Sequence, residues 1–352
     1  MKVKFAIVTT SRADLGILKP LIKKLLKKKN NIVISTASNL SKKLGFSQKE
    51  LSFVNQNQLF KINTLENVKI SPKSIFELTL NKFNIFFKKK KIEYIIILGD
   101  RYETLGVALS AYFNKIKIIH LYGGEKTFGS DDNIFRNCIT QLSDYHFCST
   151  KNSLINLNNI LTDKKKIIHI GSLSVEKIEN KFKKKEKKNY CIISIHPEKK
   201  IHELINFTKQ IFKIILKKTN FKIILTGTNI DFNSDALRKV FFEQLKLHKN
   251  RIEYYENLGT EKYLNFLSHA KFLIGNSSSG IIESPSLKTP FINIGERQAG
   301  RETAKSTIFV GFNIKKTINA INNLQSIKNS HFKNPYYKKN TLKNMELLLS
   351  KI

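Results

Sequence analysis

Cysteine is scarce in this chain of 352 residues, and its three cysteines show no pattern that would bind a metal. Cys138, Cys148 and Cys191 lie too far apart for the short paired spacing of a zinc site. Scattered cysteines of this kind are typical of reduced thiols in a reducing compartment. We therefore expect a cytoplasmic protein without a metal site.

Long apolar runs and a targeting segment are also missing. No uninterrupted apolar stretch is long enough to span a bilayer. The N-terminus, MKVKFAIVTTSRAD, has a short apolar run that ends in polar and charged residues. A signal peptide has a longer apolar region and a small-residue cleavage site. We expect this run to form a first strand, and we expect no membrane partner.

Acidic residues are few compared with basic ones: 27 against 62, which gives a net charge of +35. Such a charge suggests nucleic acid, anionic lipid or a phosphorylated substrate. The lysines lie in scattered runs, at 88–91, 164–166 and 183–188, and few aromatic residues alternate with them to stack on bases. Together with the abundance of Asn, Ile and Phe, this looks like a drift toward AT-rich codons. We expect no nucleic-acid partner, and a polyanion binder is the weakest alternative.

Apolar strand-like runs alternate with amphipathic helix-like stretches, a pattern that predicts α/β architecture with parallel sheets covered by helices on both faces. In the first half the expected strands are 3–8, 32–36, 94–98, 116–120, 145–149 and 167–171. The expected helices there are 15–28, 75–89, 102–114 and 133–143. We find no internal repeat.

The pattern restarts after a lysine-rich stretch at 172–188, which we interpret as a linker. Strands are expected at 190–195, 222–225, 252–255, 272–274 and 291–294, and helices at 201–217, 235–246, 260–269 and 280–286. The prediction is a domain at 1–171, the linker, a domain at 189–330, and a tail at 331–352 whose helix packs back on the first domain. Two doubly wound domains facing one another would place a ligand in a central cleft, at the carboxyl ends of the strands.

The segment KFLIGNSSSG, residues 271–280, gives the sharpest local signal. A short apolar strand stops at Gly275, three serines follow, and a helix is expected next. Unpaired N–H groups at a helix start, the hydroxyl groups of Ser277, Ser278 and Ser279, and glycines that admit a ligand suit a phosphate. The alternative is a serine-rich N-cap without a ligand.

Polar residues also follow the other expected strands. In the first half these are Ser11, Arg12, Asp14, Asp100, Arg101, Glu103, His120, Tyr122, Glu125, Asp131 and Asp132. In the second half they are His196, Asn229, Asp231, Glu296, Arg297 and Arg301. Carboxylates gather in the first half, as acid–base chemistry requires, whereas serines, His196 and Arg297 gather in the second, as phosphate binding requires.

Each residue also has a structural explanation. Arg12 or Asp14 could cap the following helix, and Asp100 with Arg101 could form a surface ion pair. His196 could be a satisfied loop histidine, and Gly123–Gly124 a simple turn. No single structural explanation covers the common position of all these residues at strand ends.

Taken together, the motifs resemble the hydrolysing UDP-N-acetylglucosamine 2-epimerases, a group that includes enzymes acting on UDP-N,N'-diacetylbacillosamine. The resemblance rests on TSRADLGILKPLI, LGDRYETL, HLYGGEKTFGSDD, ITQLSDYHF, SIHPE and IGNSSSGIIESPSLKTPFINIGERQAGRE, in this order over nearly the whole chain. It implies the two-domain GT-B fold, nucleotide binding mainly on the C-terminal domain, no redox cofactor, and a homodimer or homotetramer.

The resemblance also implies roles for matching residues. Asp100, Glu125 and Asp132 would act in acid–base catalysis, and Arg12 and Arg101 would line the cleft. The residues expected to hold UDP are His196, Asn229, Leu258, Ser277, Ser278, Glu283 and Arg297. The implied reaction eliminates UDP to a glycal, adds water at C1 and returns a proton to the opposite face of C2.

Two positions depart from the family pattern. Tyr122 stands where relatives carry Glu or His, and a phenol is a poor base near neutral pH. Asn137 stands where relatives usually have His. Altered activity is one consequence of these departures, and more work for Glu125 is another.

Two other enzymes remain as alternatives. A GT-B glycosyltransferase would use the same UDP clamp but has less need for a carboxylate cluster. A non-hydrolysing epimerase would carry an EAG-type sequence where this chain has YGGE. The sequence leaves open which UDP-sugar is used, whether for sialic or for legionaminic acid synthesis.

Overall fold

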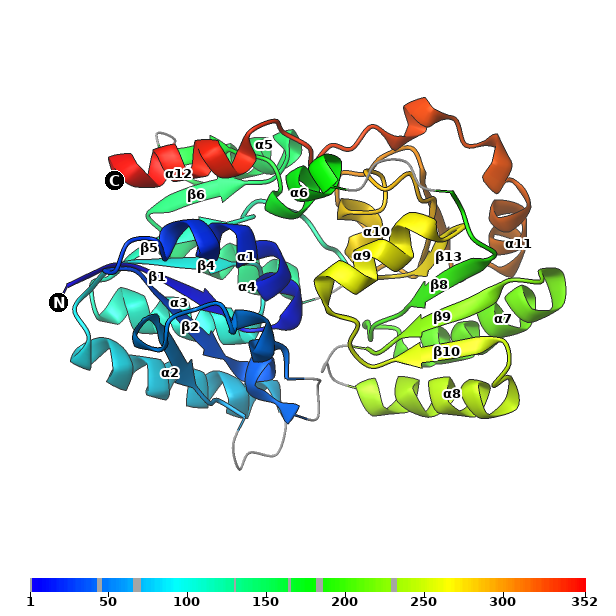
Figure 1. Ribbon diagram of the computed structural model, residues 1–352, viewed down its shortest axis with the longest axis horizontal. Helices are drawn as coiled ribbons and strands as arrows, with labels where there is room; N and C mark the ends of the chain where they lie inside the picture. The colour runs from blue at the N-terminus through cyan, green and yellow to red at the C-terminus, as the bar shows by residue number, and fades with distance from the viewer. Residues whose placement is uncertain are drawn as a thin grey trace. The chain divides into compact units, whose positions relative to one another are not determined.

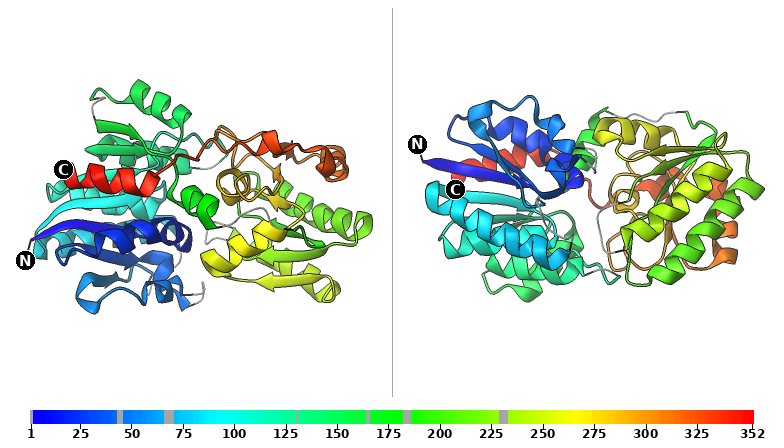
Figure 2. Two further views of the ribbon diagram at one scale, coloured as in Figure 1. Left: turned by 45° about the horizontal axis from the view of Figure 1, so that its top comes forward. Right: turned by 90° about the horizontal axis from the view of Figure 1, so that it is seen from below.

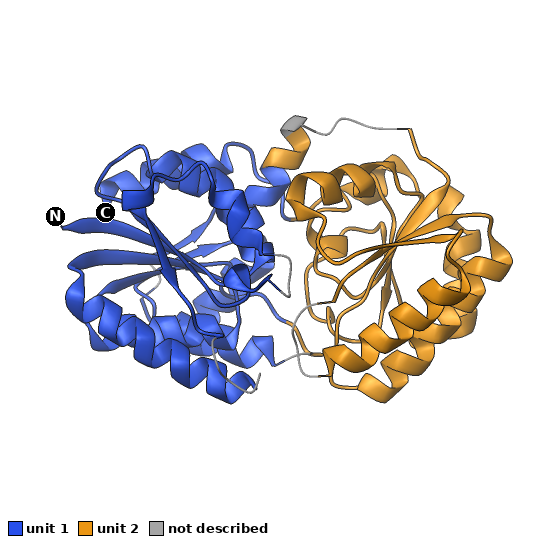
Figure 3. Ribbon diagram, turned by 60° about the horizontal axis from the view of Figure 1, so that its bottom comes forward, with its two compact units in different colours: residues 1–126, 131–176, 336–352 blue, residues 127–130, 177–335 orange. Residues whose placement is uncertain are grey.

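The computed structural model describes residues 2–42, 46–65, 71–129, 131–163, 166–181, 186–228 and 233–352. It divides into two compact units, shown in separate colours in Figure 3. Unit 1 comprises Met1–Lys126, Asp131–Glu176 and Tyr336–Ile352, and unit 2 comprises Thr127–Ser130 and Lys177–Pro335. The stretch expected to be a linker therefore contains the boundary between Glu176 and Lys177.

Unit 1 is built on a parallel sheet whose order is β3-β2-β1-β4-β5-β6-β7 over the described residues. The strands are β1 Val3–Thr9, β2 Ile32–Thr36, β3 Leu59–Ile62, β4 Ile92–Leu98, β5 Lys117–Leu121, β6 Tyr145–Cys148 and β7 Ile167–His169. The helices are α1 Arg12–Leu25, α2 Pro72–Lys89, α3 Tyr102–Phe113, α4 Asp132–Leu142, α5 Lys151–Ile160, α6 Leu173–Lys181, which continues across the unit boundary, and α12 Thr341–Lys351.

Unit 2 has a second parallel sheet, with the order β10-β9-β8-β11-β12-β13. Its strands are β8 Tyr190–Ser194, β9 Lys222–Thr226, β10 Ile252–Tyr255, β11 Leu273–Gly275, β12 Phe291–Ile294 and β13 Thr307–Gly311. Its helices are α7 Ile201–Lys218, α8 Ser234–Leu247, α9 Gly259–His269, α10 Ser279–Ile282 and α11 Ile314–Asn322. Both units are thus Rossmann-like, as expected for the GT-B fold, and helices cover both faces of each sheet (Figure 1, Figure 2).

The strands are apolar on both sides because both faces of a parallel sheet are buried. In β1, Phe5 and Ile7 belong to one core cluster, while Ala6 and Val8 belong to the cluster on the opposite face. This alternation follows from the two-residue period of a strand.

The C-terminal helix α12 packs on unit 1. Met345 and Leu349 join the core cluster that contains Phe5 and Ile7, and the Tyr94 hydroxyl donates to the carbonyl of Ile352 at 3.1 Å. Within the described parts of the chain, no helix is long and apolar enough to cross a membrane.

Side-chain caps fix where several helices begin. Ser71, Thr150 and Asn313 each accept a hydrogen bond from the backbone N–H three residues later, at the starts of α2, α5 and α11. Such caps satisfy one of the N–H groups that a helix start leaves unpaired.

Both sheets reverse their strand order between two central strands, β1 and β4 in unit 1 and β8 and β11 in unit 2. In open α/β sheets, ligands bind beyond the carboxyl ends of the strands at this switch point. The strand order therefore selects four loops: those after β1 and β4, and those after β8 and β11.

Candidate active site

The switch point of unit 1 joins the loops that carry Arg12, Asp100 and Arg101. Strand β1 pairs in parallel with β4, so their carboxyl ends lie side by side. Arg12 is the first residue of α1, and Asp100 and Arg101 follow β4 directly. The parallel pairing thus brings Arg12 near the adjacent residues Asp100 and Arg101, which lie far from it in the sequence.

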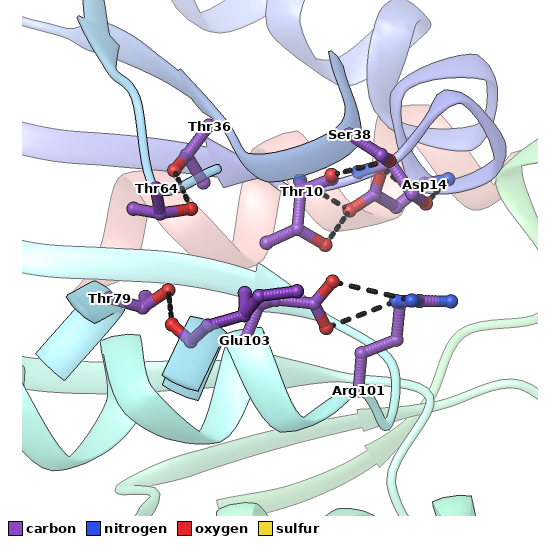
Figure 4. Close-up of polar contacts among 10 residues, drawn as sticks. Thr10, Asp14, Thr36, Ser38, Thr64, Thr79, Arg101 and Glu103 are labelled. Carbon is purple, nitrogen blue, oxygen red and sulfur yellow. Dashed lines mark hydrogen bonds and ion pairs between the residues drawn. The ribbon is translucent and has the colours of Figure 1, made fainter. Parts of the chain in front are cut away.

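Asp14 caps the start of α1, as the structural explanation for this residue predicted. Its carboxylate accepts from the backbone N–H groups of Thr10 (2.7 Å), Ser11 (2.8 Å) and Leu15 (2.7 Å), and Ser11 completes a capping box (Figure 4). Burial raises the pKa of Asp14, and the hydrogen bonds from Thr10 and Ser11 oppose that shift. Asp14 therefore fixes the turn from which Arg12 projects.

Arg101 pairs with Glu103. Its Nε and Nη2 atoms lie 3.2 and 3.3 Å from the two carboxylate oxygens of Glu103, which is buried (Figure 4). A two-pronged contact of this kind holds the guanidinium plane in one orientation.

Asp100 instead pairs with Arg136, a residue of α4 that is buried. Arg136 Nη2 donates to the carboxylate of Asp100, and Nη1 donates to the backbone carbonyl of Glu125 at 2.7 Å. One guanidinium therefore connects the loop after β4 with the loop after β5. Removing one partner of a buried ion pair costs about 3–5 kcal/mol, because the other charge stays buried.

His120, on β5, is a neutral buried residue beneath this group. Its Nε2 lies 2.8 Å from the carbonyl oxygen of Gly99, which can only accept, so Nε2 carries the proton and Nδ1 accepts from Thr140 at 3.2 Å. Burial lowers the pKa of His120 to about 3. His120 thus supports the backbone just before Asp100 and is not suited to proton transfer near neutral pH.

The other two expected carboxylates lie on neighbouring elements. Glu125 is buried, and its Oε1 accepts from the hydroxyl of Ser149 at 2.5 Å. Asp132 is the first residue of α4, one helical turn before Arg136 and on the same helix face. Asp100, Glu125 and Asp132 are therefore linked through α4 and its arginine.

Tyr122 has a structural role, which answers the question raised by its departure from the family pattern. It is buried in a core cluster; its hydroxyl accepts from the N–H of Leu173 at 2.8 Å and donates to Ser172 at 3.3 Å. Tyr122 thus anchors the start of α6, and a larger share of the acid–base work for Glu125 stays a prediction. Asn137 is exposed on α4.

In unit 2, Asn276 connects the two loops that meet at the switch point. Its side-chain oxygen accepts from the N–H of His196 at 2.7 Å, and its nitrogen donates to the carbonyl of His196 at 2.8 Å. These two bonds connect the loop after β8 to the loop after β11. Asn276 is fully buried, so both bonds are shielded from water.

A third loop, after β12, is attached to the same point. Glu198 accepts from the backbone N–H of Arg297 at 3.1 Å, and the guanidinium of Arg297 donates to the carbonyl of Asn276 at 3.3 Å. Burial raises the pKa of Glu198, and the hydrogen bonds it accepts from Asn276 and Arg297 counteract this. His196 and Arg297, both expected site residues, are thus brought together through Asn276 and Glu198.

The loop between β11 and α10 carries Ser277 and Ser278, and the helix that follows it is shorter than expected. Helix α10 is a single turn, whereas the sequence predicted a helix over 280–286. Pro285 explains the difference, because the residue before a proline avoids the α conformation. Among the described residues, no acceptor is found for the backbone N–H groups of Ser277, Ser278 and Ser279. The phosphate hypothesis therefore depends on these donors and not on a long helix dipole.

The remaining expected UDP ligands are spread around unit 2. Leu258 immediately precedes α9, and Glu283 immediately follows α10. Asn229, and Asp231 beside it, lie outside the described residues.

One ion pair of unit 2, Arg238 with Glu256, was not among the candidates from the sequence. Arg238 holds Glu256 by two contacts, one of 2.5 and one of 2.8 Å, and reaches the carbonyl of Thr228 at 3.1 Å. This pair ties the ends of β9 and β10 together just before Leu258. Glu256 directly follows β10, so its place at a strand end was a usable signal, whereas Arg238 lies inside α8 and carries no such signal.

A group of three or more His, Cys, Asp or Glu residues able to hold a metal does not occur in the described ranges. The arrangement instead offers carboxylates with one buried arginine in unit 1, and neutral donors with Arg297 in unit 2. The first suits proton transfer, and the second suits an anionic group.

A family model for UDP-N-acetylglucosamine 2-epimerase matches residues 23–349, which is most of the chain. The protein belongs to this family. Hydrolysing GDP/UDP-N,N'-diacetylbacillosamine 2-epimerase of Campylobacter jejuni is 32% identical over 330 residues, covering 87% of this chain and 84% of that protein. Polysialic acid biosynthesis protein P7 of Escherichia coli is 34% identical over 286 residues, covering 75% and 71%.

The fold agrees with solved structures of the epimerase family. The structure of the Methanocaldococcus jannaschii UDP-GlcNAc 2-epimerase, in complex with UDP-GlcNAc and UDP, matches 99% of this chain and 100% of its own with a TM-score of 0.82. The identity is 21%, so this similarity concerns the fold. The protein is therefore an enzyme of the UDP-N-acetylglucosamine 2-epimerase family with the GT-B fold.

Proposed function

We propose that the protein is a hydrolysing 2-epimerase, which converts a UDP-2-acetamido sugar into the free C2-inverted sugar and UDP. The substrate is UDP-N-acetylglucosamine or UDP-N,N'-diacetylbacillosamine, and the product would supply nonulosonic acid synthesis. The observation that carries the proposal is the contact of buried Arg136 with both the carboxylate of Asp100 and the main chain of Glu125, which connects two expected acid–base residues. An epimerase needs such a pair of carboxylates, and simple transfer of a sugar does not. The hydrolysing relative from Campylobacter jejuni supports the same assignment.

The reaction requires two proton transfers and a good leaving group. A base removes the weakly acidic proton on C2 while the C1–O bond breaks and UDP leaves with the bonding electrons, giving a glycal. Water then adds at C1, and an acid returns a proton to the opposite face of C2. Neither step changes the oxidation state of the sugar overall, so no redox partner is required.

The carboxylates of unit 1 are the proposed acid–base groups. Asp100 is held by Arg136, while Glu125 is buried and bonded to Ser149. The two carboxylates thus have different partners, a guanidinium for Asp100 and a hydroxyl for Glu125. The third proposed acid–base residue of unit 1 is Asp132. The positive charges of Arg12 and Arg101 would compensate the negative charge on the departing diphosphate.

The loops of unit 2 are the proposed nucleotide site. The N–H groups and hydroxyls of Ser277 and Ser278, with Arg297, would bind the diphosphate. Glu283 would accept from the ribose hydroxyls, Leu258 would lie beside the uracil, and His196 and Asn229 would complete the set. UDP affinity should therefore depend on unit 2 and turnover on unit 1.

The test is incubation of the purified protein with UDP-N-acetylglucosamine, with UDP-N,N'-diacetylbacillosamine, and with the GDP form of the latter sugar. The GDP arm is included because the Campylobacter jejuni relative carries both nucleotides in its name. Free nucleoside diphosphate and a C2-inverted free sugar, identified by NMR, are the expected products, and the fastest arm identifies the substrate.

Two other results would reject the proposal. An intact UDP-sugar with inverted C2 would indicate a non-hydrolysing epimerase. Unchanged substrate in all arms, from a folded protein that binds UDP and transfers the sugar to an added acceptor, would indicate a glycosyltransferase.

A further inference from the structure

We propose that Arg136 is a positioning residue for the proposed epimerisation: its guanidinium holds the carboxylate of Asp100 and the main chain at Glu125 in one fixed geometry. The inference rests on the proposed function for its catalytic meaning. Its structural part stands on contacts within unit 1 alone.

Three contacts define the role. Arg136 Nη2 donates to the carboxylate of Asp100, Nη1 donates to the Glu125 carbonyl at 2.7 Å, and Nη1 also lies 3.4 Å from Oδ1 of Asn133. The side chain of Arg136 is 1% exposed, whereas that of Asp100 is 21% exposed. The arginine is thus covered, while its partner keeps an accessible side from which it can meet a substrate.

Two neighbouring basic residues of unit 1, His120 and Arg101, have contacts of their own. His120, on β5, is neutral, because burial lowers its pKa to about 3. Arg101 is engaged with Glu103, and Asp132 precedes Arg136 by one helical turn. The charged and titratable residues near Arg136 include Asp100, Glu125, Asp132 and His120.

The geometry needs arginine rather than any cation. A guanidinium presents several N–H donors in a rigid plane and can serve two acceptors on different loops, whereas an ammonium group acts as a point charge. Lysine at position 136 would keep the charge but could not hold both loops in the same way. A displacement of about 1 Å at a reacting group can cost roughly 10²-fold in rate.

The first test compares Arg136→Lys with wild type and with Arg251→Lys in steady-state turnover. Arg251 is the matched control, since its guanidinium binds the carbonyls of Thr219 and Phe221 in unit 2. We expect R136K to lose roughly 10²-fold in kcat with little change in KM, and R251K to keep wild-type kcat. Equal, small losses in both variants would overturn the proposal.

The second test uses Arg136→Ala and does not depend on turnover. The Asp100 carboxyl is followed by carbon NMR and is assigned by the loss of its signal in Asp100→Asn. In R136A it should titrate about one to three pH units higher than in wild type, and added guanidinium should reverse the shift and restore turnover. A merely structural arginine would leave that titration unchanged.

The two tests separate the two proposals. If wild type turns over none of the nucleotide sugars but the Asp100 signal shifts in R136A, the proposed function fails and the positioning contact stands. If wild type is active, R136K turns over normally and the Asp100 titration is unchanged in R136A, the positioning role is wrong while the function stands.

Discussion

The two switch points use the same strand order but hold their loops with different groups. In unit 1, the loops after β4 and β5 are connected by the charged pair of Arg136 and Asp100. In unit 2, the loops after β8 and β11 are connected by the neutral amide of Asn276. The buried carboxyl of Glu198 there is bound by backbone N–H groups and an amide, and burial raises its pKa.

The difference shows how one topology supports two kinds of chemistry. Proton transfer needs carboxylates whose charge and direction are fixed, and a buried arginine provides both. Binding of a diphosphate needs hydrogen-bond donors, and in unit 2 Asn276 and the carboxyl of Glu198 hold the loops that carry the backbone N–H groups and Arg297. We therefore infer that unit 1 determines the rate and unit 2 determines nucleotide affinity, and five changes can break or sharpen this division.

The largest effect should come from Asp100→Asn in unit 1. Loss of an acid–base group lowers turnover by roughly 10²–10⁴-fold, while UDP affinity in calorimetry should stay at the wild-type level. Asp163→Asn is the control, because Asp163 is an exposed aspartate of the same unit. A fall in UDP affinity equal to the fall in turnover would break the comparison.

Gly275→Ala should produce the largest loss of stability in unit 2. Gly275 has a φ of +148°, and a Cβ there would lie 1.9 Å from the carbonyl oxygen of Ser194. We expect a loss of more than about 3 kcal/mol in the free energy of unfolding. Gly311→Ala is the control: its φ is +57° and nothing lies within 4 Å of its Cβ, so only the backbone cost of about 1–2 kcal/mol applies.

Asn276→Ala should weaken UDP binding and leave the chemistry of unit 1 intact. The N–H and carbonyl of His196 would lose their buried partner, which costs about 2–4 kcal/mol of stability. UDP affinity, measured by calorimetry, should fall, while kcat at saturating substrate should change little. Asn313→Ala, which removes only the cap of α11 in the same unit, should cost about 1 kcal/mol and leave UDP affinity unchanged.

The smallest effects should appear in the pH dependence of stability. Burial lowers the pKa of His120 in unit 1 from 6.5 to about 3, so the unfolded chain binds a proton first as pH falls. The contribution of neutral His120 to the free energy of unfolding is fully present above pH 6.5. It is lost as pH falls toward 3, by up to about 1.4 kcal/mol per pH unit. His120→Gln should flatten the acid side of a curve of unfolding free energy against pH.

Unit 2 should respond on the alkaline side instead. Lys187 donates to Ser268, Leu287 and Thr289, and burial lowers its pKa from 10.5 to about 8. Between pH 8 and 10.5 the unfolded chain keeps a proton that the native state has released, so stability should rise with pH. An unchanged curve in Lys187→Met would contradict this assignment.

The sequence predicted the buried parts of the fold and missed the less buried ones. Strands β2 and β12 have the predicted bounds, because their apolar runs are short and complete. The edge strand β10 also has the predicted bounds, although only Ile252 of its residues is fully buried. The edge strands β3 and β13 were not predicted, since both are only partly buried and carry mixed residues. Helix α6 lies in the expected linker because Leu173, Val175 and Ile178 are buried despite the lysines that follow.

The candidate site shows the same limit. Strand ends pointed to Asp100, Glu125 and His196, because topology brings such positions together in any doubly wound sheet. Arg136 and Asn276 were not chosen, since their importance depends on partners 36 and 80 residues away. The anchoring role of Tyr122 could not be predicted for the same reason: its partner Leu173 lies on another element.

The most direct measurement is the deuterium content at C2 of the sugar released by wild type in deuterated water, in a reaction stopped early. The account predicts one deuterium at C2 of the inverted free sugar, since a carboxylate removes the original proton and a solvent-derived one replaces it. Released sugar that keeps its original C2 hydrogen would contradict the account, because the carboxylates of unit 1 would then have moved no proton at that carbon.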